Sequence, residues 1–151
     1  MSKIYVIGSL RNSNIPVVGE QLRAATGWDV FDDWFAGGYE ADDKWKAYEE
    51  ARGRHYSEAI LGEAATHVFE FDKHHLDTSD ACVLVTPAGK SGHLELGYMA
   101  GQGKKTYVYF DGEPDRWDVM YRFVDKVFFS MDELIGELNS DTSHSHTTER
   151  A

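Results

Sequence analysis

Short runs of apolar residues separated by polar loops are the first feature of this chain. Several of them are continuous and rich in β-branched or aromatic residues, which is typical of strands buried on both faces. They cover residues 3–8, 28–31, 68–71, 80–86, 104–110 and 127–129. Helical spacing of apolar residues predicts helices at 15–25, 41–65 with a break near Gly53, 93–102, 117–124 and 131–138. This alternation predicts an α/β domain of three layers with a mostly parallel sheet of about five strands.

The C-terminal segment lacks the apolar runs found in the rest of the chain. Residues 140–150 contain no large apolar side chain. Such a segment cannot offset the entropy that it loses on ordering. We therefore expect one domain over residues 1–139 and a disordered tail over 140–151.

Composition narrows the classes of function. The chain has 151 residues, and 26 Asp and Glu against 15 Lys and Arg give it a formal net charge of −11. This balance argues against binding to a nucleic acid polymer or an anionic membrane, although it leaves room for a small local anion site. The single cysteine, Cys82, excludes an internal disulfide and a cysteine-based zinc module. With neither a long apolar run nor a signal-peptide pattern, we expect a cytoplasmic protein.

Three loops fall at the predicted carboxyl ends of strands, where open parallel sheets bind their ligands. They cover residues 8–12, 71–77 and 87–95. The third loop contains Gly89-Lys90-Ser91, which is similar to the end of a phosphate-binding P-loop, but Leu84 stands where that motif needs a glycine. We therefore exclude a nucleoside triphosphatase. What remains is a glycine-containing loop opening a helix, whose free N–H groups could hold an anion.

Two carboxylates belong to these loops. Glu95 lies near the start of the predicted helix, where an acidic side chain also complements the helix dipole. Asp72 directly follows the predicted strand 68–71. Two carboxylates at neighbouring strand ends could flank one ligand atom, and glycosidic-bond chemistry uses such a pair as nucleophile and proton donor. Both the helix-dipole and the catalytic interpretation of Glu95 stay open at this point.

Other side chains in the loops have competing interpretations. His74 and His75 suggest a metal site, but adjacent histidines rarely bind one ion together, so we expect surface histidines and neither a metal nor a cofactor. His93 could contact a substrate or cap the helix start. Trp34 follows a strand in a loop rich in glycine and aspartate, where its ring could stack on a flat base.

Three segments taken together carry a resemblance to a known family. They are KIYVIGSLR at residues 3–11, Asp72 with Leu76 and Asp80, and SGHLELGY at residues 91–98. With these segments the chain resembles the nucleoside 2-deoxyribosyltransferase superfamily, which includes the 2'-deoxynucleoside 5'-phosphate N-hydrolases. The resemblance extends to about Lys105 and is poor over residues 32–65. It implies a flavodoxin-like fold.

The resemblance also implies roles for the residues of the three loops. Glu95 would attack C1' of the sugar, and Asp72 would assist the leaving base. Gly8, Ser9 and Arg11 would hold a 5'-phosphate, and Ser91 and Gly92 would contact the sugar or the phosphate. The family implies a homo-oligomer in which a neighbouring subunit completes each site.

These roles favour a transferase that moves a deoxyribosyl group from a (deoxy)nucleoside to another base. The alternative within the same chemistry is an N-glycosidase that hydrolyses a (deoxy)nucleoside 5'-monophosphate, and Arg11 is its main support. A nucleotide-binding module without turnover is a third hypothesis, although such a module needs neither carboxylate beside an anionic ligand. A flavodoxin-like electron carrier has no flavin-specific feature in its favour.

Overall fold

One parallel sheet organises the chain. The computed structural model describes residues 2–150, and their side chains as far as residue 141. Five strands lie in the order β2–β1–β3–β4–β5, and every pairing is parallel. They are β1 (Lys3–Ile7), β2 (Asp29–Phe31), β3 (Ala81–Val85), β4 (Lys105–Tyr109) and β5 (Lys126–Phe128). This is the flavodoxin-like strand order. It confirms the fold class predicted from the sequence.

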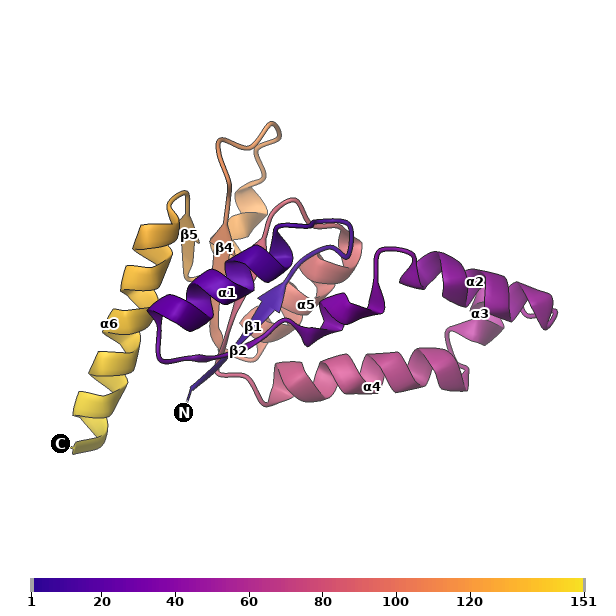
Figure 1. Cartoon of the computed structure of the whole chain (residues 1–151), viewed down its shortest axis with the longest axis horizontal. Coiled ribbons are helices and arrows are strands. Elements are labelled where there is room, and N and C mark those ends of the chain that lie inside the picture. Colours follow the sequence, from indigo (N-terminus) through magenta and orange to yellow (C-terminus); the bar gives the residue numbers. More distant parts are fainter. Residues whose placement is uncertain (1, 151) are drawn as a thin grey trace.

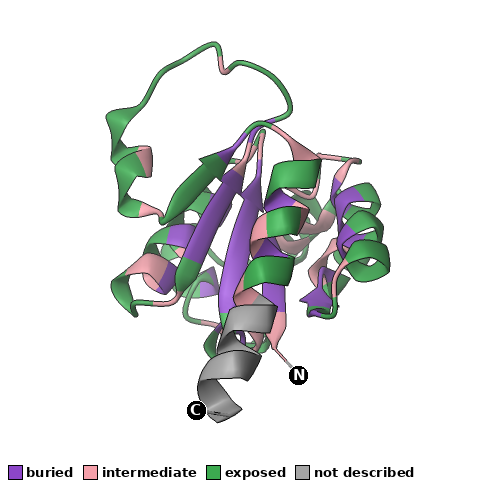
Figure 2. Cartoon of the chain, turned by 90° about the vertical axis from the view of Figure 1, so that its left-hand side faces the viewer, coloured by how far each residue is buried: buried purple, intermediate pink, exposed green. Residues whose placement is uncertain are grey.

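Helices cover both faces of the sheet, so the central strands are buried (Figure 2). The alternation along β1 sends Ile4 and Val6 to one face and Tyr5 and Ile7 to the other. The first face packs against α1 (Ile15–Ala25) and α6 (Met131–Arg150). The second packs against α4 (Glu63–Asp77) and α5 (Lys90–Gly101), the helices that carry Asp72 and Glu95.

The strand order reverses beside β1. The chain runs from β1 to β2 on one side and then returns to place β3 on the other side of β1. The loops after β1 and β3 therefore leave the same edge of the sheet and diverge, which opens a crevice at their carboxyl ends. This crevice is the position that the sequence predicted for a ligand.

An arm extends away from the sheet (Figure 1). We use this name for α2 (Ala41–Ala51), α3 (Tyr56–Ala59) and the N-terminal part of α4, which follow a 3₁₀ turn, η1 (Asp33–Gly37). Within α2 and α3 only Glu49 and Ala59 are buried. The chain turns between these helices at Gly53, whose φ of 75° is in the left-handed region that favours glycine.

The prediction of a strand at residues 68–71 is wrong. These residues lie inside α4, where Val68, Phe69 and Phe71 are exposed. A four-residue segment with three apolar side chains fits both periodicities, and only the continuation of the helix to Leu76, which is buried on the sheet, decides between them. Asp72 therefore lies on a helix and not at the end of a strand. Likewise, the segment 117–124 forms only a 3₁₀ turn, η2 (Val119–Phe123).

The last helix also differs from its prediction. The pattern ended it at Leu138, whereas α6 continues to Arg150. Just beyond Leu138, Asp141 accepts a hydrogen bond of 2.5 Å from Lys105 at the start of β4. Side chains from residue 142 onward and the whole of residue 151 lie outside the described residues, so the disordered tail over 140–151 stays a prediction. No helix in the described part of the chain is long and apolar enough to span a bilayer.

Candidate active site

Glu95 lies in the second turn of α5 and its side chain reaches back to the sheet. The loop after β3 ends at Gly89, and α5 begins at Lys90. The Tyr5 hydroxyl donates a hydrogen bond of 3.0 Å to Glu95 Oε2. Tyr5 is only 1% exposed and points from β1 toward the same face of the sheet. The carboxylate is thus held over the end of β1 at the boundary of the core.

Asp72 approaches the same position from α4. Burial raises the pKa of Asp72 to about 6. Burial also raises the pKa of Glu95 to about 7, an effect that the Tyr5 hydrogen bond opposes and the negative charge of Asp72 reinforces. The pKa of the Tyr5 phenol is raised by burial and then by the charges of both carboxylates. Glu95 therefore contacts the Tyr5 hydroxyl, and Asp72 lies near enough to act on both groups through its charge, in surroundings that favour holding a proton near neutral pH.

Sequence reasoning missed Tyr5. Its signal was a hydroxyl-bearing side chain inside an otherwise aliphatic strand, since a buried tyrosine hydroxyl normally finds a hydrogen-bond partner. The partner comes from a residue 90 positions further along the chain, which no local pattern indicates.

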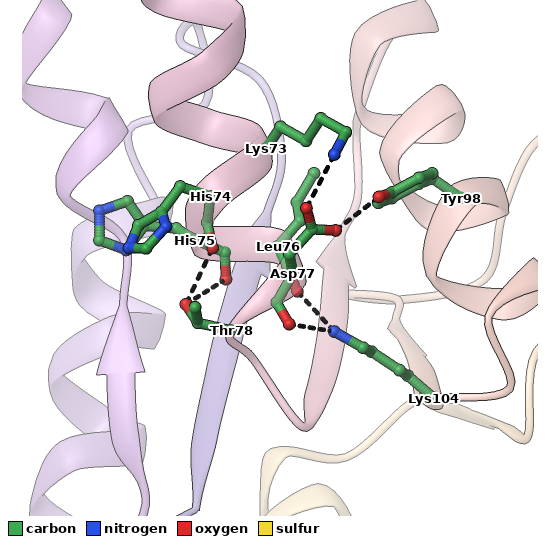
Figure 3. A network of polar contacts seen from close by, with 8 residues as sticks. All are labelled: Lys73, His74, His75, Leu76, Asp77, Thr78, Tyr98 and Lys104. Carbon is green, nitrogen blue, oxygen red and sulfur yellow. Dashed lines mark hydrogen bonds and ion pairs between the residues drawn. The ribbon is translucent and has the colours of Figure 1, made fainter.

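A polar network joins α4 to α5 and to Lys104 just after it (Figure 3). Asp77 accepts hydrogen bonds from the Tyr98 hydroxyl at 2.5 Å and from Lys73 Nζ at 2.9 Å. These bonds, led by that from Tyr98, lower the pKa of Asp77 to about 2. Lys104 Nζ donates to the carbonyl oxygens of Leu76 and Asp77, at 2.9 and 2.8 Å. The network therefore fixes the helix that carries Asp72 against the helix that carries Glu95.

A small pocket lies in the crevice at the carboxyl ends of β1 and β3. Its volume is about 160 Å³, and its lining residues are Ser9, Arg11, Asn12, Pro87, Ala88 and Gly89. The Asn12 side-chain amide nitrogen is buried without a hydrogen-bond partner among the described residues. Gly89 caps the start of α5 without a side-chain hydrogen bond to the first turn. The pocket therefore presents unpaired N–H donors, which suit an anion.

Arg11 stands at the rim of this pocket. Its guanidinium is largely exposed and lies 3.9 Å from Asp43, a separation at which an exposed pair contributes little. Ser9 Oγ accepts a hydrogen bond of 3.1 Å from the Arg11 backbone N–H, which shapes the loop after β1. Arg11 is thus free to turn toward a ligand in the pocket.

Gly8 and Gly92, the two glycines predicted to contact a substrate, lie where the backbone packs closely against side chains of the core. A Cβ on Gly8 would stand 2.3 Å from Ile15 Cδ1, and one on Gly92 would stand 3.1 Å from a Leu84 methyl. Gly92 is buried, and its small size lets α5 pack closely on the sheet. Ser91, beside it, is exposed in the first turn of α5. Contacts of these residues with a substrate stay predictions.

Trp34 and His93 each form hydrogen bonds between segments that border the crevice. Trp34 Nε1 donates a hydrogen bond of 2.7 Å to the Val6 carbonyl, so η1 is held at the carboxyl end of β1. The indole is half-buried and packs edge-on against Phe35. His93 Nδ1 lies 2.8 Å from the Gly89 carbonyl oxygen, and Nε2 lies 2.8 Å from the Tyr121 hydroxyl of η2. Stacking on a base by Trp34 and substrate contact by His93 remain predictions.

The adjacent histidines lie on α4 and not in a loop. His75 stacks on Phe31 with the ring centres 3.8 Å apart, and its Nδ1 lies 2.9 Å from Lys3 Nζ. Burial lowers the pKa of His75. His74 is exposed. Across the described residues, no group of three or more His, Cys, Asp or Glu side chains is placed to hold a metal ion.

Comparison with known proteins gives matches in structure only. No protein-family model matches the chain, and no curated protein matches it significantly in sequence. A conserved protein from Enterococcus faecalis V583 has a similar structure, with a TM-score of 0.63 and 13% identity over 93% of this chain and 99% of that one. A 2-deoxyribosyltransferase from Bacillus psychrosaccharolyticus has a TM-score of 0.60 and 17% identity over 89% of this chain and 90% of its own.

A CMP N-glycosidase from Clostridium botulinum has a TM-score of 0.52 and 13% identity, over 91% of this chain and 98% of that one. At these identities the likeness concerns the fold. It extends over about nine-tenths of this chain in each case. The chain therefore has the fold of a 2-deoxyribosyltransferase and of a CMP N-glycosidase, as the resemblance in its sequence implied.

Proposed function

We propose that the protein cleaves the N-glycosidic bond of a (deoxy)nucleoside and transfers the deoxyribosyl group to another base. The observation that carries this proposal is a pair of partly buried carboxylates: Glu95 accepts a hydrogen bond from the Tyr5 hydroxyl, and Asp72 lies near enough for its charge to raise the pKa of both groups. Retaining glycosidic chemistry requires one carboxylate to attack carbon and a second to protonate the leaving group. The fold shared with a 2-deoxyribosyltransferase and a CMP N-glycosidase supports the same chemistry.

In the first step, Glu95 attacks C1' of the sugar. A bond forms between a Glu95 carboxylate oxygen and C1', and the bond from C1' to the base nitrogen breaks with its electron pair going to the base. Asp72 supplies the proton that the departing base takes up. In the second step, a nitrogen of another base attacks C1', and the bond from C1' to the Glu95 oxygen breaks with its electron pair going to Glu95. Asp72 takes up the proton that the attacking nitrogen loses, which restores both acids and completes the transfer. Dividing the displacement in this way is the usual benefit of covalent catalysis.

The electrostatics of the pair set a condition on these roles. Between about pH 6 and 7, the range set by the pKa values of Asp72 and Glu95, the two carboxyls together hold about one proton. Because the pKa of Asp72 is the lower of the two, that proton lies mainly on Glu95 before substrate binds, so the proposed roles require it to move to Asp72 in the complex. The Tyr5 hydrogen bond stabilises the charged form of Glu95 and so favours this proton transfer, while the choice of Glu95 as nucleophile rests on the resemblance in the sequence. This chemistry requires no metal and no cofactor.

A second candidate is an N-glycosidase that hydrolyses a (deoxy)nucleoside 5'-monophosphate. The small pocket at the carboxyl ends of β1 and β3 favours this hydrolase. Arg11 and the unpaired amide nitrogen of Asn12 offer donors there for a phosphate group. Water would then take the place of the acceptor base in the second step.

We also propose that a second copy of the chain completes the site. Leu94, next to Glu95, is 75% exposed, and Phe69, one turn before Asp72, is 61% exposed. Large apolar side chains beside the two acids favour contact with another protein surface. Such a contact would also exclude water from the glycosyl-enzyme, which a transferase needs.

One experiment separates these possibilities. The protein is incubated with deoxynucleosides and with their 5'-monophosphates, with and without an acceptor base, and products are separated by chromatography. Base release that requires an acceptor identifies a transferase, and release without an acceptor identifies a hydrolase. Binding without release by the folded protein would instead identify a binding module and refute the proposal. Glu95→Gln serves as the control that retains the shape of the site.

A further inference from the structure

A second pocket lies in the arm, where α2, α3, the segment between them and the first turn of α4 supply its lining. Its volume of about 490 Å³ is within the range of small-molecule sites. Its lining residues are Tyr48, Glu49, Arg52, Arg54, Glu58, Gly62, Glu63 and Ala64. None of the residues assigned to the glycosidic reaction is among them. The pocket therefore needs an explanation of its own.

Glu49 supplies an unpaired hydrogen-bond acceptor to this pocket. The side chain is 4% exposed, and its Oε1 accepts a hydrogen bond of 2.7 Å from Arg54 Nη1. Its Oε2 is buried and has no hydrogen-bond partner in the described part of the chain. Oε2 lies 3.7 Å from the place that a Cβ on Gly62 would take, at the wall of the pocket. A buried carboxylate oxygen without a donor is unfavourable, and an N–H group of a ligand would satisfy it.

Hydrogen-bond donors stand next to this acceptor. The 15-residue helix α4 begins here, its N-cap residue, Gly62, has no side chain to cap the first N–H groups, and the first-turn residues Glu63 and Ala64 line the pocket. Arg54 is partly exposed beyond its bond to Glu49. Arg52 stacks with its guanidinium carbon 4.5 Å from the centre of the Tyr48 ring. Together these groups suit an anion.

We propose that the arm pocket binds a small zwitterion of the α-amino acid class. The ligand's ammonium group donates to Glu49 Oε2, and its carboxylate accepts from Arg54, Arg52 or the first N–H groups of α4. A simple anion is disfavoured because Glu49, Glu58 and Glu63 surround the site. A divalent cation is disfavoured because two guanidinium groups line it. Only a ligand that carries both charges matches both sets of groups.

Titration calorimetry on the full chain tests this proposal, with the common amino acids as probes. For each amino acid that binds, its amide, which lacks the carboxylate, and its analogue without the amino group are measured beside it. We expect saturable binding by at least one amino acid and a loss of about ten- to a hundredfold in each analogue, the effect of removing a charged hydrogen-bond partner. The absence of saturable binding across the panel overturns the proposal, as does an analogue that binds equally well.

Substitutions in the arm test whether the amino acid binds in this pocket. Glu49→Gln keeps the shape and the bond to Arg54 but loses the negative charge, so affinity should fall about ten- to a hundredfold. Glu50→Gln, an exposed neighbour on α2, is the matched control and should bind as the parent does. Arg52→Ala changes an exposed residue that folding does not require, and it too should weaken binding. Unchanged affinity in both Glu49→Gln and Arg52→Ala refutes the site. Base release is not measured, so failure here leaves the proposed reaction untouched.

Discussion

Replacing Glu95 with glutamine should make the protein more stable while abolishing its turnover. Folding raises the pKa of Glu95 from its ordinary value of 4.5 to about 7, mainly through burial. Folding therefore favours the protonated form, and the parent protein loses stability as the pH rises from 4.5 through about 7. A glutamine carries no charge at any pH, so it avoids this loss. The nucleophile itself is removed, so base release should stop.

The gain in stability expected for Glu95→Gln follows from the rise in the pKa of Glu95 on folding. The rise corresponds to roughly 3 kcal/mol, and partial exposure of the side chain reduces this to about 2 to 3 kcal/mol. For a chain of this size, that is an increase of roughly 4 to 12 °C in melting temperature. The increase should be fully present at pH 8.5 and absent at pH 4, below the ordinary pKa of a glutamate.

Thermal unfolding followed by circular dichroism at both pH values measures the difference. Glu50→Gln, at an exposed position on α2, controls for the loss of one negative charge from an acidic protein. A melting temperature for Glu95→Gln at pH 8.5 equal to or below that of the parent protein would refute the argument that burial disfavours the ionised carboxylate. The same gain at pH 4 and 8.5 would refute it too, because the effect would then not depend on ionisation.

Four further predictions concern individual groups. Asp72→Asn should reduce turnover most for bases that leave poorly, because acid assistance matters most for them; equal losses, by chromatography, would indicate a structural role. Arg11→Ala should raise KM for a 5'-monophosphate about ten- to a hundredfold and leave that for the nucleoside almost unchanged, as steady-state kinetics would show. Tyr98→Phe removes the hydroxyl that binds Asp77 and should lower kcat with little change in KM, since Asp72 and Glu95 lose their fixed separation while binding groups stay; a change in KM alone would contradict this. Truncation after Asp141 keeps the contact with Lys105, so melting temperature and base release should not change; lost activity in a folded truncation would place the tail in a site.

The sheet could be predicted from the sequence because its strands carry their own signal. The run from Ala81 to Val85 is apolar at every position and is bounded by polar residues, and every one of these side chains is buried. The arm was predicted only in part: helical spacing over residues 41–65 with a break near Gly53 corresponds to α2, α3 and the start of α4, whereas the segment 68–71 was assigned to a strand. Its helices bury few residues, so the apolar run at residues 68–71 had no amphipathic pattern that would distinguish a helix from a strand.

The candidate site was predictable in part. Asp72 and Glu95 were identified by residue type and by the resemblance, although Asp72 was assigned to the wrong kind of element. The helix α4 nevertheless brings Asp72 close enough to raise the pKa of Glu95. Tyr5 and the pair of Tyr98 with Asp77 were not identified, because each depends on contacts between residues distant in the sequence. Such contacts follow from the packing of helices on the sheet and not from local periodicity.

The two edges of the sheet have a consequence for how copies of this chain can associate. The edge strands, β2 and β5, contain only three residues each. Each edge therefore presents a very short row of backbone groups to another strand, which limits the joining of sheets from two molecules and the aggregation that follows from it. A dimer built by continuing the sheet would gain few hydrogen bonds. The proposed pairing of copies should accordingly proceed through helix surfaces, with each sheet remaining closed to further strands.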